Sequence, residues 1–100
     1  MRCYWDEDDT WFYFEVDASG WVTRQVELEG PQRVPVAAAS LAEWQRAQDA
    51  GQLDQYDGRF GITAEIPVSE WEGHHPEPLT REEFENVWEP ARRHIADPPT

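Results

Sequence analysis

A run of acidic side chains near the start of the chain is the first candidate for chemistry: Asp6, Glu7, Asp8 and Asp9. Carboxylates bind hard cations, and a calcium loop of the EF-hand type needs acids at positions 1, 3 and 5, Gly at 6 and Glu at 12. Counted from Asp6, those last three positions hold Thr10, Trp11 and Asp17, so the pattern fails. The run is typical of a solvated acidic turn, and we predict no metal there.

The nitrogen and sulfur donors predict no catalytic or metal site either. His74 and His75 are adjacent, so their side chains diverge, and a closed metal site needs further ligands that the sequence scarcely offers. Cys3 lies among acids, which raise a thiol pKa and make it a poor nucleophile. The chain has no glycine-rich phosphate loop, nucleophile elbow or metalloprotease motif. We therefore predict no catalytic residues, no metal and no cofactor, and an enzyme stays only an alternative.

A hairpin should position the aromatic side chains, of which the chain has 13, including six Trp. Residues 11–16 are rich in aromatic and β-branched types, 17–20 form a turn signal, and 21–28 alternate at period 2. The alternation predicts that Phe12, Phe14 and Val16 face the core, with Val22, Val26 and Leu28. Trp11 and Tyr13, joined by Trp21, are then expected on the opposite face, which either a helix or a partner should cover. Arg24 falls on the apolar side and needs a carboxylate partner, from Glu15 or from a helix.

The remaining elements complete an α+β prediction. Residues 2–6 and 34–38 suit two further strands, the second at an edge because of Pro35. Ser40 and Glu43 form a capping box that opens a helix ending at Gly51. Asp57-Gly58 signals a turn, 60–66 a short strand and 73–78 a loop.

A second capping box, Thr80 with Glu83, opens a helix whose apolar stripe includes Trp88. Pro90 lies inside that stripe and should kink or end the helix near 88–89. We predict an antiparallel sheet of three to four strands with two helices packed on one face. The single α+β domain should span residues 1–96, and residues 97–100 should form a disordered tail.

The charge excludes several classes of partner. The chain of 100 residues has a net charge of −13, which opposes binding to nucleic-acid phosphates and to anionic membranes. No apolar run follows Arg2, so we expect no signal peptide, and no apolar stretch is long enough to predict a membrane span. The lone cysteine cannot form an internal disulfide, so we expect a cytoplasmic protein.

The chain resembles a group of small acidic bacterial proteins, each a single domain, whose function is undescribed. The resemblance rests on Tyr13-Phe14-Glu15-Val16-Asp17, on Arg24-Gln25-Val26-Glu27-Leu28, on Ile66-Pro67 and on the run from Leu79 to Trp88. Members usually have a basic residue where this chain has Gln25. The resemblance implies a stand-alone domain and no catalytic residues.

Three interpretations of function remain open. The first is a protein–protein interaction module, immunity- or inhibitor-like, in which carboxylates steer a basic protein partner towards an aromatic patch. Its binding residues would be Trp11, Tyr13, Trp21, Arg24, Asp6, Asp8 and Asp9. The second is a small-molecule binder or enzyme with an aromatic pocket on the sheet. The third is a domain without a specific binding surface, whose tryptophans fill a small core. The sequence is compatible with either a monomer or a homodimer.

Overall fold

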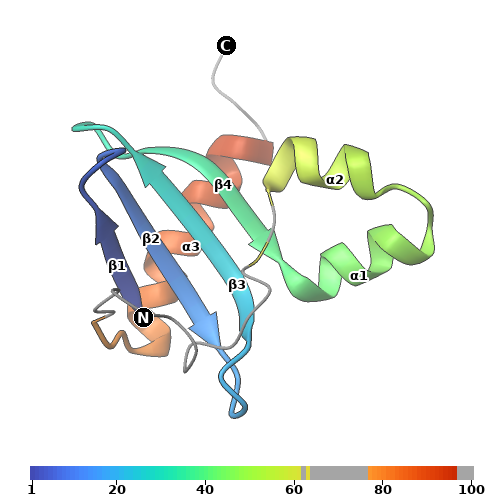
Figure 1. Cartoon of the computed structure of the whole chain (residues 1–100), viewed down its shortest axis with the longest axis horizontal. Coiled ribbons are helices and arrows are strands. Elements are labelled where there is room, and N and C mark those ends of the chain that lie inside the picture. Colours follow the sequence, from blue (N-terminus) through green and yellow to red (C-terminus); the bar gives the residue numbers. More distant parts are fainter. Residues whose placement is uncertain (62, 64–76, 97–100) are drawn as a thin grey trace.

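The computed structural model describes residues 1–61, 63 and 77–96 and has an α+β fold (Figure 1). The strands are β1 (Arg2–Trp5), β2 (Thr10–Val16), β3 (Val22–Glu29) and β4 (Val34–Ser40). The helices are α1 (Leu41–Asp49), α2 (Leu53–Phe60) and α3 (Arg81–Ala96). The sheet is antiparallel with the order β1-β2-β3-β4, which confirms the predicted class and adds a third helix to the two expected.

The predicted hairpin is present, and its turn chemistry explains why. Asp17 accepts hydrogen bonds from the backbone N–H groups of Ser19 and Trp21 through Oδ1, at 2.9 and 3.0 Å. Gly20 takes a φ of 86°, which a residue without a Cβ adopts at little cost. These contacts hold β2 and β3 in a register that places Tyr13 opposite Val26 and Glu15 opposite Arg24.

That register corrects the predicted faces of β2. Directly opposed residues on antiparallel strands share a face, so Tyr13 lies with Val26, and Trp11 lies with Leu28. Tyr13 is only 5% exposed and belongs to the main core cluster, against which Trp11 packs. The prediction that Trp11 and Tyr13 lie on the face opposite Val26 was therefore wrong, and a helix, one of the two predicted covers, packs over them. Phe14, expected on the core face with Val26, is buried on the other face of the sheet.

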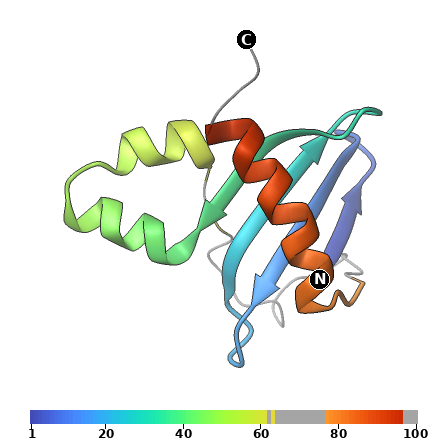
Figure 2. The same ribbon diagram turned by 180° about the vertical axis from the view of Figure 1, so that it is seen from behind.

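Helix α3 covers the face that carries Tyr13 and Val26 (Figure 2). Phe84 and Ala91 are buried in the core cluster, and Trp88 packs against it, which confirms the predicted apolar stripe. The capping box is also confirmed, because Glu83 N–H donates to Thr80 Oγ1 and Thr80 N–H donates to Glu83 Oε1.

Pro90 was predicted to kink or end this helix, and the second of these alternatives was wrong. The helix continues through Pro90 to Ala96. Pro90 is exposed, while its neighbour Ala91 is 1% exposed. Packing of the apolar stripe on the sheet therefore outweighs the backbone hydrogen bond that proline removes.

Helices α1 and α2 form a hairpin beside β4, at the edge of the sheet (Figure 1). Ser40 caps α1 by accepting from Glu43 N–H at 3.4 Å, and the helix gives way to Gly51 with a φ of 70°, as expected. Glu43 does not complete the capping box, because Ser40 N–H donates to the hydroxyl of Tyr56 instead.

The turn predicted at 57–58 was wrong, since both residues lie inside α2. The strand predicted at 60–66 begins on the last residue of α2, and most of it lies outside the described residues. The loop prediction for 73–76 and the tail prediction for 97–100 also lie outside them. In the described parts of the chain, no helix combines the length and the apolar character that crossing a bilayer requires.

Candidate functional site

The structure separates the residues predicted to form one binding surface. Tyr13 is in the core, and Trp11 is half-buried beside the acidic turn between β1 and β2. Trp21, which is 42% exposed, precedes β3 at the opposite end of the hairpin, near Arg24. Two regions therefore replace the single predicted patch: the acidic turn at one end of the sheet and the surroundings of Arg24 at the other.

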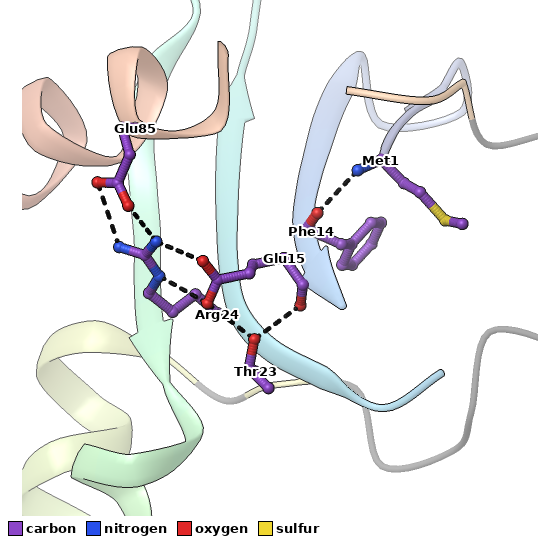
Figure 3. A network of polar contacts seen from close by, with 6 residues as sticks. All are labelled: Met1, Phe14, Glu15, Thr23, Arg24 and Glu85. Carbon is purple, nitrogen blue, oxygen red and sulfur yellow. Dashed lines mark hydrogen bonds and ion pairs between the residues drawn. The ribbon is translucent and has the colours of Figure 1, made fainter. Parts of the chain in front are cut away.

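Arg24 is the centre of a polar network that joins β3, β2 and α3 (Figure 3). Its Nε donates to Glu15 Oε1 at 3.0 Å, and its Nη2 forms ion pairs with Glu15 and with Glu85. Thr23 donates its hydroxyl to the same Glu15 oxygen at 2.8 Å. The prediction that Arg24 pairs with Glu15 or with a helix carboxylate is confirmed, and both partners are present.

The network sets the protonation of its members. Hydrogen bonds from Arg24 hold the pKa of Glu15 below its usual value, against the opposing effect of burial, and Thr23 adds to the lowering. The pKa of Glu85 is lowered in the same way, first by its hydrogen bond to Arg24. The hydrogen bond to Glu15 is the largest influence that raises the pKa of Arg24. All three groups therefore stay charged at neutral pH, and the network is fixed rather than poised to transfer a proton.

A cavity of about 560 Å³ opens beside this network. It lies between the C-terminal end of β2, the start of β3 and the first turn of α3. Its polar lining consists of Glu15, Asp17, Thr23, Thr80 and Arg81. A cavity of this size, with apolar walls and a few polar groups, is typical of small-molecule sites.

A second arginine network links α1, α2 and α3, and the sequence analysis missed it. Arg92 forms a two-pronged ion pair with Glu43, at 2.6 and 3.2 Å, and Tyr56 donates its hydroxyl to Glu43 at 2.8 Å. The guanidinium of Arg92 lies 4.0 Å from the ring centroid of Phe60 and 5.0 Å from that of Trp88. The available signal was the four-residue spacing of Tyr56 with Phe60, which places both on one helix face.

This second network is structural in character. Burial raises the pKa of Tyr56 to about 12, and the hydrogen bond to Glu43 adds to the effect against the opposing one from Ser40. Burial also raises the pKa of Glu43, but hydrogen bonds from Arg92 and Tyr56 outweigh it and leave the pKa lowered. A protonated phenol and an ionised carboxylate form a stable pair at neutral pH, so this network holds the helices together.

The acidic turn is held in place by its own contacts. Tyr4 donates its hydroxyl to Asp9 Oδ1 at 2.7 Å, and Gly30 N–H of the neighbouring turn donates to the Asp9 carbonyl at 2.8 Å. Asp6, Glu7 and Asp8 are exposed, and none of the three forms an ion pair within the described parts of the chain.

Metal ligation finds no support in the described ranges, which hold no group of three or more His, Cys, Asp or Glu side chains placed to bind an ion. His74 and His75 lie outside the described residues. Comparison of the chain with known protein families, with curated proteins and with solved structures gave no match.

Proposed function

We propose that the protein is an interaction module that binds a basic protein through its acidic turn. The proposed surface, called here the acidic-turn surface, consists of Tyr4, Asp6, Glu7, Asp8, Asp9 and Glu29. The observation that carries the proposal is a group of three neighbouring exposed carboxylates in this turn. Elsewhere, Glu15, Glu43 and Glu85 are paired with arginines, whereas Asp6, Glu7 and Asp8 face solvent without an ion pair in the described residues.

Charge of this kind acts on association before contact is made. A net charge of −13 exceeds the magnitude of about 2–8 that solubility alone suggests for a small domain. Exposed carboxylates on a rigid turn attract a basic surface and raise the association rate. Arg33, which lies 5.5 Å from the ring centroid of Trp11 in the adjoining turn region, offsets part of this charge.

The aromatic contribution differs from the predicted one. Tyr4 is 44% exposed, and its ring lies 5.0 Å from that of Trp11, centroid to centroid. An exposed tyrosine beside carboxylates supplies apolar contact area together with a hydrogen-bonding group, as at many interface hot spots. Tyr4 and Trp11 therefore take the place that the sequence analysis gave to Trp11, Tyr13 and Trp21.

The test is affinity capture from a lysate of the source cells, with two variants that remove equal charge. One neutralises the turn with Asp6→Asn, Glu7→Gln and Asp8→Asn, and the other neutralises the exposed Asp49, Asp54 and Asp57 of α1 and α2 as asparagines. We expect the wild type and the helix variant to retain the same basic protein at about 50 mM salt and to release it at about 500 mM.

The turn variant should fail to retain that protein even at about 50 mM salt. Retention of the same proteins by the turn variant and the wild type would overturn the proposal. An empty column for folded wild-type protein at low salt would overturn it as well. A protein retained equally at both salt concentrations would contradict the electrostatic mechanism.

A further inference from the structure

The cavity beside the Arg24 network has an apolar wall that a ligand's body can contact. Met1, Val16, Leu79 and Phe84 line this wall. Phe84 is only 3% exposed, and its packing in the core cluster holds its ring in place. Apolar walls of this kind bind a hydrocarbon or aromatic group and exclude water from it.

The charged groups of the lining divide into those already neutralised and those that are not. Glu15 is bound by Arg24 and Thr23, and the N-terminal ammonium of Met1 donates to the Phe14 carbonyl at 2.8 Å. At the adjoining helix start, Glu83 accepts the capping hydrogen bond from Thr80 N–H, and Glu85 pairs with Arg24. Of these carboxylates only Glu15 lines the cavity, and all three already have hydrogen-bond or ion-pair partners.

Arg81 and Asp17 are different. Arg81 is exposed on the first turn of α3, where its charge helps to lower the pKa of Glu15 and of Glu85, but its guanidinium forms no direct ion pair within the described residues. Asp17 is exposed at the end of β2, and its turn contacts use Oδ1, which leaves Oδ2 without a partner in the described residues. Within the described residues, one side of the cavity thus offers a guanidinium without a direct ion pair, and the other offers a carboxylate oxygen without a hydrogen bond.

We infer that this cavity binds a small zwitterion with an apolar side chain, of the α-amino-acid class. Its carboxylate would pair with Arg81, where the amide dipoles at the start of α3 add positive potential. Its ammonium would pair with Asp17, and its side chain would contact Phe84 and Leu79. A zwitterion pairs with Arg81 and with Asp17 at the same time, whereas a singly charged ligand pairs with only one of them.

The charge of the whole chain supports this choice over an anion. At −13, the chain repels a ligand of net negative charge such as a nucleotide, while a zwitterion carries no net charge to repel. This inference is independent of the acidic turn, which lies at the other end of the sheet.

The test is calorimetric titration of the protein with L-phenylalanine and L-leucine, together with two phenylalanine analogues. Phenethylamine lacks the carboxylate, and 3-phenylpropanoate lacks the ammonium group. We expect saturable binding of at least one amino acid below about 10 mM. If L-phenylalanine is the ligand, each analogue should bind about tenfold more weakly or worse, because each loses one charge-assisted hydrogen bond.

Two variants assign each end of the ligand to a residue. Arg81→Gln should weaken L-phenylalanine about tenfold and leave phenethylamine unchanged. Asp17→Asn, which keeps an Oδ1 acceptor for the turn, should weaken L-phenylalanine and leave 3-phenylpropanoate unchanged. Arg93→Gln and Asp57→Asn, exposed and remote from the cavity lining, are the matched controls and should bind as the wild type does.

Absence of saturable binding by both amino acids would overturn the inference. So would undiminished binding of the bound amino acid by Arg81→Gln or by Asp17→Asn. Binding of phenethylamine as tight as that of L-phenylalanine would show a cation site and would also overturn it. None of these results bears on partner capture by the acidic turn, so the two proposals fail separately.

Discussion

Arg24 of β3 and Glu85 of α3 form an ion pair although they are 61 residues apart in the sequence. Arg24 also lies 5.0 Å from the ring centroid of Phe84 and 4.9 Å from that of Trp88, so one side chain both packs against the helix and pairs with it. Because Arg24 pairs with Glu15 on the sheet as well, it connects the two layers of the fold.

Replacing Arg24 with alanine should therefore destabilise the protein. The substitution leaves Glu15 and Glu85 without their partner and removes the contacts with the two rings. Since both carboxylates remain partly exposed to water, we expect a loss of about 2–3 kcal/mol in the free energy of unfolding, less than for a fully buried pair. Chemical denaturation measures the loss. Arg93→Ala, at an exposed position on the same helix, should change the value by less than about 0.5 kcal/mol; equal losses in both variants would contradict the role given to Arg24.

Stability should depend on pH through Glu15, whose pKa is lowered by its hydrogen bonds from Arg24. The folded state then binds the proton less readily than the unfolded state, in which the pKa is about 4.3. The stabilisation by the charged form is present above that pH and is lost as the pH falls through the lower folded value. The wild type should exceed Glu15→Gln in stability at pH 7, and the difference should narrow below about pH 4. Urea denaturation of both proteins from pH 7 to pH 3 tests this, and a difference that stays constant would contradict it.

The charged form of Glu27 should lower the stability of the fold, in contrast to that of Glu15. Burial on β3, with a smaller effect of Glu29, raises the pKa of Glu27, so its charged form destabilises the folded state. Glu27→Gln should stabilise the protein at pH 7 by about 0.5–1 kcal/mol. This gain should shrink as the pH falls through the raised folded pKa towards that of the unfolded chain, because the wild-type carboxyl then becomes neutral too. Glu29→Gln, at an exposed position of the same strand, is the control for the loss of one charge; a gain of the same size there would show a general charge effect instead.

Because Tyr13 is buried and Trp21 is exposed, their replacement by alanine should affect stability differently. Tyr13→Ala removes a ring packed in the core cluster and should lower the free energy of unfolding by about 3–5 kcal/mol. Trp21→Ala, at a position 42% exposed, should lower it by less than about 1 kcal/mol. Thermal or chemical denaturation compares the two, and a Tyr13→Ala protein as stable as the wild type would contradict the assignment of the β2 faces.

The strands, two of the three helices and the capping positions could be predicted because they depend on local chemistry. Residues 22–28 alternate cleanly, and Thr80 with Glu83 forms a recognisable cap. Residues 10–16 do not alternate between polar and apolar types, because aromatic side chains occupy successive positions. Either face of this strand could therefore pack against the core. The face was decided by the register with β3, which pairs Tyr13 with Val26.

Helix α2 could not be predicted because its stability comes from contacts with other elements. Asp57-Gly58 favours a turn, and Gly58 inside a helix is unfavourable by about 1 kcal/mol relative to alanine. Contacts of Tyr56 with Glu43 and of Phe60 with Arg92 outweigh this local preference. The candidate sites were predicted in part: the acidic residues and Arg24 were identified, while the cavity depends on β2 and α3 meeting and leaves no pattern in the sequence.

The strand order β1-β2-β3-β4 has a consequence for the route by which the chain folds. Each strand pairs with its neighbour in the sequence, so the sheet forms through short loops, which close quickly. Docking of α3 requires the much longer closure that joins Arg24 to Glu85. We expect the hairpins to form before the helix docks, so that changes in the turn at 17–20 slow refolding, whereas loss of the Arg24–Glu85 contact mainly speeds unfolding.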